Sequence, residues 1–213
     1  MIKNAVNYDR VNLVNDNDEI IASADKYEAH LGEALLHQAI SLFLFKKNQQ
    51  GDIELLMQKR SQQKIVGAEQ WANTVCGNVA EGETHQQCLW RRLRQELGIN
   101  FPKNIQEQLQ EIFVFKYCVA CNHKYSEREI DHIFALFLDE QQLGAQKPTD
   151  LIIKLNPAEV SEVRWVNWSE LKDKQEISGL VLTPWFKLFL QEPTIIQAIQ
   201  QFLEDLSNSN LTN

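Results

Sequence analysis

The sequence lacks any long run of basic residues. Its 213 residues include 21 Lys and Arg against 29 Asp and Glu, which gives a formal charge of -8, and the acidic residues are spread along the chain. A protein that binds nucleic acid through phosphate contacts needs a basic patch or stripe. We therefore expect no nucleic-acid partner, whereas a small anionic substrate stays open if a few cations converge in one cleft.

Long apolar runs are also missing. The longest, such as 39–45, are far shorter than the roughly 20 residues that a bilayer-spanning helix needs. Residues 1–10 are polar and no apolar core follows them, so we expect no secretory signal, no membrane contact and a cytoplasmic location. Cysteine is scarce too, and is found at Cys76, Cys88, Cys118 and Cys121. In that location we expect reduced thiols and not a disulfide framework.

The length and composition are those of one globular domain. Hydrophobic residues make up 44% and charged residues 23% of the chain, so we expect a single domain over 1–213, with a core over about 26–190 and a helical tail over about 184–213. Apolar patterning predicts strands at 11–14, 39–45, 54–59, 112–117, 129–138 and 162–166. It predicts helices at 84–97, 168–172 and 184–206, the last interrupted near Glu192, and a surface loop at 141–150. Strands that enclose a helix in mixed order predict an α/β or α+β sandwich.

The strongest motif lies in residues 77–99. Gly77 is followed after five residues by Glu83, then after seven more by Arg91, and the motif ends on Glu96, Gly98 and Ile99. This pattern resembles the Nudix box, which implies that the segment binds a diphosphate. Arg92 and Gln95 stand where the box has carboxylates, and hard cations need several oxygen ligands, so Nudix hydrolysis is disfavoured. On the residues alone, an amphipathic surface helix without a catalytic role stays open.

Further segments carry a more specific resemblance. They are Lys26-Tyr27 with His30 and His37, Arg60 with Lys64, residues 71–77 around Cys76, Phe115-Lys-Tyr117, Glu127-Arg-Glu129-Ile-Asp131, and Trp165. In order and spacing, residues 26–185 resemble type I isopentenyl diphosphate isomerase of the Nudix superfamily. The resemblance implies a Nudix-type mixed β-sheet sandwich flanked by helices. It also implies interconversion of isopentenyl and dimethylallyl diphosphate, by protonation and deprotonation, in isoprenoid biosynthesis.

The resemblance also implies the catalytic groups. Cys76 and Glu129 would move protons on opposite faces of the five-carbon chain, Tyr117 would hydrogen-bond the glutamate, and Trp165 would present its ring to the cationic carbon. A thiol suits this role because neighbours can move its ordinary pKa, about 8.5. Taken alone, Cys76 fits a small core residue and Trp165 a core tryptophan.

A metal site is implied by the same resemblance. Its ligands would be His30, His37, Glu127, Glu129 and Asn78, the last standing where most members of the family have histidine. Because an amide oxygen is a harder and weaker donor than imidazole, we expect zinc or manganese to bind in a weakened or retuned site. The seven-residue spacing of the histidines would put them on one face of a helix, and alternation puts Glu127 and Glu129 on one face of a strand. On the residues alone, structural histidines and a solvated strand face stay open.

Basic residues would capture the diphosphate. By resemblance these are Lys26, Arg60, Lys64 and Arg92, with Gly77 beside them, and Glu96 would hold a Mg²⁺ that bridges the substrate oxygens. An arginine in place of a Nudix glutamate exchanges metal binding for direct phosphate binding. Each basic residue alone fits a solvated surface charge.

Two other functions compete with the isomerase. One is a Nudix pyrophosphohydrolase, and the other is a weakened relative that only binds prenyl diphosphates. We expect a small-molecule prenyl diphosphate substrate as the partner, and a monomer or homodimer. Cys118 and Cys121 form a Cys-x-x-Cys pair without a second pair, and we interpret them as part of a loop that joins two strands.

Overall fold

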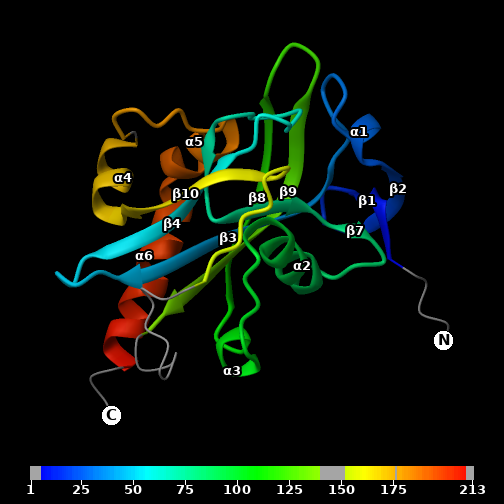
Figure 1. Ribbon diagram of the computed structural model, residues 1–213. Helices are drawn as coiled ribbons and strands as arrows, with labels where there is room; N and C mark the ends of the chain where they lie inside the picture. The colour runs from blue at the N-terminus through cyan, green and yellow to red at the C-terminus, as the bar shows by residue number, and fades with distance from the viewer. Residues whose placement is uncertain (1–5, 140–151, 176, 210–213) are drawn as a thin grey trace.

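A mixed sheet with helices on both faces forms the body of the protein (Figure 1). The computed structural model describes residues 6–139, 152–175 and 177–209. The strands in these ranges are β1 Asn7–Val14, β2 Ile20–Asp25, β3 His37–Lys47, β4 Ile53–Arg60, β5 Trp71–Ala72, β6 Val75–Asn78, β7 Ala80–Glu81, β8 Gln110–Ala120, β9 Ser126–Leu138 and β10 Val160–Asn167. The helices are α1 Lys26–Ala29, α2 His85–Leu97, α3 Lys103–Gln106, α4 Trp168–Lys174, α5 Pro184–Gln191 and α6 Pro193–Ser209. The predicted α+β architecture is confirmed.

Strand β3 is the centre of the sheet. It pairs in parallel with β9 from His37 opposite Glu129 onward, and antiparallel with β6, where Ser41 lies opposite Cys76 and Ala39 opposite Asn78. It also pairs with β1 and β4. One strand therefore brings together residues that are about ninety positions apart in the sequence.

The two faces of β3 belong to two apolar clusters. Ile40, Leu42 and Leu44 pack with the buried side of α2, whereas Phe43 and Phe45 pack with residues from α4, α5 and α6. Figure 1 shows α2 against one face of the sheet and the C-terminal helices against the other. A strand buried on both faces reads as a continuous apolar run, as 39–45 does.

Helix α2 has clear signals at both ends. Thr84 accepts a hydrogen bond from the Gln87 amide while the Gln87 side chain returns one to the Thr84 amide, so the two form a capping box. Gly98 ends the helix at φ 67°, and a Cβ there would lie 2.7 Å from the Lys154 carbonyl oxygen. Both the conformation and the close approach therefore require glycine.

The predicted elements are present, but the sequence missed the short ones. Strands β2, β5, β6 and β7 and helices α1 and α3 were not expected. The predicted break near Glu192 is confirmed, since α5 ends at Gln191 and α6 begins at Pro193. The predicted loop at 141–150 lies outside the described residues.

The histidine spacing was wrongly interpreted as helical. His30 follows the last turn of the four-residue helix α1, whereas His37 is the first residue of β3. A turn between them brings their ring centroids to 4.6 Å. The two imidazoles therefore meet through a chain reversal and not along a helix.

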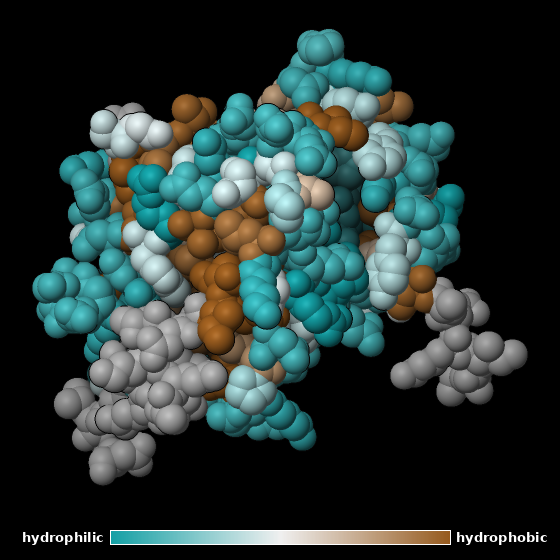
Figure 2. All heavy atoms as spheres, in the orientation of Figure 1, coloured by the Kyte–Doolittle hydropathy of each residue, from teal (hydrophilic) through white to brown (hydrophobic). Residues whose placement is uncertain are grey.

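The surface is mostly hydrophilic in the orientation of Figure 2, with a band of apolar residues near its middle. Of the helices in the described ranges, none combines the length and apolar character that crossing a bilayer requires.

Candidate active site

A cavity of about 360 Å³ opens between α1, α2, the start of α5 and strands β6, β8 and β9. Its lining includes most of the predicted site residues, namely Lys26, His30, Arg60, Lys64, Cys76, Gly77, Asn78, Arg92, Tyr117, Glu127 and Glu129. These residues are spread over more than one hundred positions of the sequence. The sheet pairings described above explain why they meet.

Two imidazoles and two carboxylates gather at the inner end of this cavity, where His30, Glu127 and Glu129 line it and His37 is fully buried outside the lining. One ligand atom from each of His30, His37, Glu127 and Glu129 lies within 4.8 Å of the other three. His30 Nε2 lies 2.9 Å from Glu127 Oε2, and His37 Nε2 lies 3.4 Å from Glu129 Oε1. Nitrogen and carboxylate donors at this spacing fit a borderline divalent cation, so the donor set passes a chemical test for a metal site.

Asn78 lies inside this group. Its Nδ2 donates to Glu129 Oε1 at 3.0 Å and lies 3.0 Å from His37 Nε2. His37 Nδ1 lies 2.8 Å from the Leu35 carbonyl oxygen, which can only accept, so Nδ1 carries a proton. The Asn78 amide therefore contacts the Glu129 and His37 atoms that would otherwise be directed at a metal.

The charges of the group are set by burial and by each other. Burial works to lower the pKa of His30, but the hydrogen bond and charge of Glu127 outweigh it and raise that pKa to about 9. Burial and the neighbouring Glu129 raise the pKa of Glu127. For Glu129, burial is opposed by the hydrogen bond and charge of His37 and by the hydroxyl of Tyr117, which together lower its pKa. Glu129 is therefore the ionised carboxylate of the pair.

Tyr117 and Asp131 flank Glu129. The Tyr117 hydroxyl donates to Glu129 Oε2 across the β8–β9 pairing, and burial with the Glu129 charge raises the tyrosine pKa well above its ordinary value. Ser41 Oγ donates to Asp131 at 2.7 Å. Burial, with Glu129 next, raises the pKa of Asp131 well above its ordinary value, so this neighbour is held neutral.

The Cys76 thiol lies on β6 at the cavity wall. Burial raises its pKa to about 12; Arg60 opposes this shift, while the charges of Glu96 and Glu129 add to it. Arg60 Nη1 lies 3.8 Å from the sulfur. At neutral pH the group is a thiol and not a thiolate, which makes it a proton donor and a poor nucleophile.

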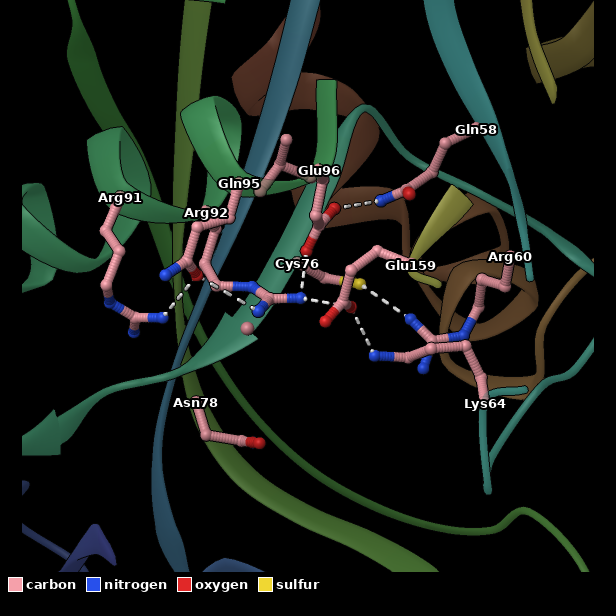
Figure 3. Close-up of polar contacts among 12 residues, drawn as sticks. Gln58, Arg60, Lys64, Cys76, Asn78, Arg91, Arg92, Gln95, Glu96 and Glu159 are labelled. Carbon is pink, nitrogen blue, oxygen red and sulfur yellow. Dashed lines mark hydrogen bonds and ion pairs between the residues drawn. The ribbon is translucent and has the colours of Figure 1, made fainter. Parts of the chain in front are cut away.

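Cations gather at the outer end of the cavity around Glu159. Its Oε2 lies 2.7 Å from Lys64 Nζ and 2.9 Å from Arg92 Nη2 (Figure 3). Arg92 also pairs with Glu96, which accepts a second hydrogen bond from Gln58 Nε2 at 2.8 Å. Burial raises the pKa of Glu159, but Arg92 and Lys64 outweigh it and lower the value to about 2.

Gly77 makes room for this arrangement. A Cβ on Gly77 would lie 2.9 Å from Arg92 Cγ, so a larger residue would have to displace the arginine. The motif's other acid, Glu83, is 8% exposed and pairs with Arg91 through two 2.7 Å contacts. The Glu83 carboxylate therefore stabilises the start of α2, and both of its oxygens accept from Arg91.

Trp165 is not brought to the cavity. It lies on β10, partly buried against the apolar cluster of α2, and the Lys46 ammonium lies 4.5 Å from its ring centroid. Trp185, at the start of α5, lines the cavity instead, with the Arg60 guanidinium 5.1 Å from its ring centroid. Its buried Nε1 has no hydrogen-bond partner among the described residues.

Sequence reasoning missed Glu159 and Trp185. Glu159 directly precedes β10, so an acid a few residues before the predicted strand 162–166 was the available signal. Trp185 follows Pro184, the first residue of a predicted helix. Neither signal distinguishes a cavity residue from an ordinary surface or core residue. The Cys-x-x-Cys pair was partly misplaced, because Cys118 lies within β8 and Cys121 just after it.

Comparisons with known proteins show the family and the fold. The NUDIX domain family model matches residues 35–186. The isopentenyl-diphosphate Delta-isomerase of Enterobacter sp. (strain 638) is 34% identical over 178 residues, which cover 83% of this chain and 86% of that protein. The enzyme of the same name from Pectobacterium atrosepticum is 31% identical over 190 residues and is covered to 93%. Among solved structures, DR0079 from Deinococcus radiodurans superimposes with a TM-score of 0.60 at 20% identity, over 85% of this chain and 97% of that one.

Proposed function

This chain belongs to the Nudix domain family and, within it, to the isopentenyl-diphosphate Delta-isomerases, and we propose that Cys76 and Glu129 are its proton-moving groups. The protein is an isomerase that interconverts isopentenyl and dimethylallyl diphosphate. The observation that carries the proposal is that the Cys76 thiol and the Glu129 carboxylate line one cavity, with the Tyr117 hydroxyl bound to the carboxylate.

The reaction needs one proton added and one removed. Toward dimethylallyl diphosphate, the terminal alkene carbon gains a proton and the methylene bonded to the other alkene carbon loses one, so the double bond moves by one position and the composition is unchanged. A buried thiol can supply a proton, and the ionised Glu129 can accept one. In the reverse direction the roles exchange. Tyr117 orients Glu129 through its hydroxyl hydrogen bond.

We assign to Trp185 the role that the resemblance implied for Trp165. Its ring lines the cavity, whereas Trp165 lies outside the cavity lining. An indole face stabilises a nearby desolvated cation by roughly 2 kcal/mol, which lowers the barrier to a carbocation. The cavity also limits the access of water to such a cation.

The diphosphate would bind to the cations of the outer cavity, Lys26, Arg60, Lys64 and Arg92. Members of the Nudix family use divalent metals, and His30, His37, Glu127 and Glu129 form a group that can hold one. We assign zinc or manganese to this group, with Asn78 beside it, and magnesium to the substrate near Glu96. A divalent cation bound to the carboxylates would offset their mutual repulsion and lower their proton affinity.

Asn78 is proposed to retune the inner metal site. Its amide donates to two of the four candidate ligands, so metal binding must break those bonds or turn the amide oxygen inward. Asn78→His should therefore raise zinc affinity and change turnover. The measurement is zinc competition with a chromophoric chelator, alongside an isomerisation assay. Tight stoichiometric zinc in the unsubstituted protein, with neither quantity altered by Asn78→His, would contradict this role.

One incubation separates the competing functions. The protein is mixed with isopentenyl diphosphate and Mg²⁺, and both acid-labile allylic product and released phosphate are measured. Allylic product without phosphate is expected, because Arg92 and Gln95 replace Nudix carboxylates and Glu83 is paired with Arg91. Phosphate release would support a pyrophosphohydrolase, and neither product would support a binding protein.

The proton-moving roles need their own variants. Cys76→Ala and Glu129→Gln should each lower turnover by orders of magnitude with an unchanged circular dichroism spectrum. Cys118→Ala is the matched control, because this thiol is exposed on β8. Near-normal isomerisation by Cys76→Ala or Glu129→Gln would overturn the assignment.

A further inference from the structure

A second group of metal-type ligands lies outside the cavity. Asp18, His85 and His132 each place one ligand atom within 4.8 Å of the other two. Asp18 comes from the β1–β2 turn, His85 is the first residue of α2, and His132 lies on β9. None of the three lines the candidate active site. The reaction proposed above makes no use of them.

Both ring nitrogens of His132 contact a carboxylate oxygen. Its Nδ1 lies 3.1 Å from Glu111 Oε1, and its Nε2 lies 2.8 Å from Asp18 Oδ2. A neutral ring carries one proton, so one of these two contacts would join two acceptors. A second proton or a metal ion must therefore lie at one of the contacts. A carboxylate on one ring nitrogen and a metal on the other is the usual arrangement of histidine ligands.

A chain of hydrogen bonds from Asn12 through Gln38 orients the carboxylate of Asp18. Its other oxygen, Oδ1, accepts from Gln38 Nε2 at 2.9 Å, and the buried Gln38 accepts in turn from Asn12 Nδ2 at 3.2 Å. This chain of hydrogen bonds holds Asp18 Oδ2 toward His132. It provides the outer support that a metal-binding carboxylate requires.

His85 supplies the third donor. Its ring stacks on that of His132 with centroids 3.7 Å apart, and its buried Nε2 has no hydrogen-bond partner among the described residues. A neutral imidazole has one nitrogen lone pair to offer a metal, and Nε2 is the nitrogen that no hydrogen bond occupies. Because ligating imidazoles must converge on the ion, His85 would turn out of the stack on binding.

We propose that Asp18, His85 and His132 bind one divalent cation of the zinc class, with Glu111 and Gln38 as supporting residues. Two imidazoles and a carboxylate are a known zinc donor set, and water can complete the coordination. Such an ion would tie the β1–β2 turn to the start of α2 and to β9. The site would be structural and separate from the candidate active site.

The test uses the full chain with His30→Gln and His37→Gln, which removes the imidazoles of the inner cavity. Zinc is titrated against a chromophoric chelator, and the thermal midpoint is recorded with and without zinc. We expect one equivalent to bind and the midpoint to rise. Adding His85→Ala or Asp18→Asn should abolish both effects, and Gln38→Leu should weaken binding about tenfold. Asp16→Asn is the matched control, since Asp16 lies in the same turn and pairs with Lys116.

Two results would overturn the proposal. One is no saturable zinc uptake by a folded background variant, which would leave His132 as a protonated bridge between two carboxylates. The other is uptake that survives both His85→Ala and Asp18→Asn. If the background variant does not fold, the unsubstituted chain is titrated instead. His85→Ala must then remove one equivalent, and an unchanged stoichiometry would refute the site.

Discussion

Glu159→Gln should tighten diphosphate binding, because the carboxylate occupies the cations assigned to the substrate. Its Oε2 lies 2.7 Å from Lys64 Nζ and 2.9 Å from Arg92 Nη2, and its side chain is 25% exposed. Partly exposed ion pairs contribute up to about 1 kcal/mol each, so a ligand that displaces Glu159 forfeits about 2 kcal/mol. This corresponds to an affinity gain of about 30-fold for the variant.

Titration calorimetry with inorganic diphosphate measures this change. The same variant should lose about 2 kcal/mol in its free energy of unfolding, because the pairs are absent from the folded protein. Glu162→Gln is the matched control, since Glu162 pairs with Arg164 on an exposed part of β10. Weaker diphosphate binding by Glu159→Gln would refute the reasoning, because it would mean that the carboxylate helps to hold the ligand.

Three further predictions follow from burial and charge. Burial raises the pKa of Cys76 to about 12, so this thiol should be alkylated far more slowly at pH 8 than the exposed Cys118, and its alkylation rate should rise steeply above pH 10. Peptide mapping by mass spectrometry measures both rates, and equal rates at pH 8 would contradict the prediction. In the folded protein the pKa of Glu159 is lowered from an ordinary 4.5 to about 2, so its contribution to stability is present above pH 4.5 and is lost as the pH falls toward 2. Acid unfolding of Glu159→Gln should lack this pH-dependent loss of stability. Identical acid-unfolding profiles of the variant and the unsubstituted protein would contradict the prediction. Phe43→Ala should cost about 3–5 kcal/mol in urea unfolding because Phe43 is fully buried among aromatic rings, whereas Val114→Ala, at a 45% exposed position, should cost far less.

Local sequence patterns predicted the strands and helices whose own residues carry a clear pattern or end signal. The apolar run 39–45 predicted the buried strand β3, and Thr84 and Gly98 marked the ends of α2. Strand β6 was missed because its four residues are too few to show a period. It forms through pairing with β3, which is a contact between distant parts of the sequence. Such contacts are not encoded in any local window.

The candidate site divides in the same way. The resemblance predicted residues that the structure brings to one cavity, including Cys76 and Glu129. It failed for Trp165 because tryptophan alone does not specify which side of which element reaches the cavity, and Trp185 lies there instead. The contacts of Asn78 were also beyond prediction, because the direction of an amide depends on its neighbours in space.

The register of β9 on β3 determines both ligand groups at once. His37 lies opposite Glu129 and contacts its carboxylate. Ala39 lies opposite Asp131, and Ser41, two residues further on, donates to the Asp131 carboxylate. The odd-numbered side chains at the start of both strands therefore face the cavity side. Gln38 and His132 have even numbers and face the side of α2, where the second group lies. A slip of one residue would turn every side chain of β9 to the opposite face. It would turn Glu129 away from His37 and His132 away from Asp18. The apolar residues 133–138 of β9, buried on both faces, therefore keep the polar residues at its start in place.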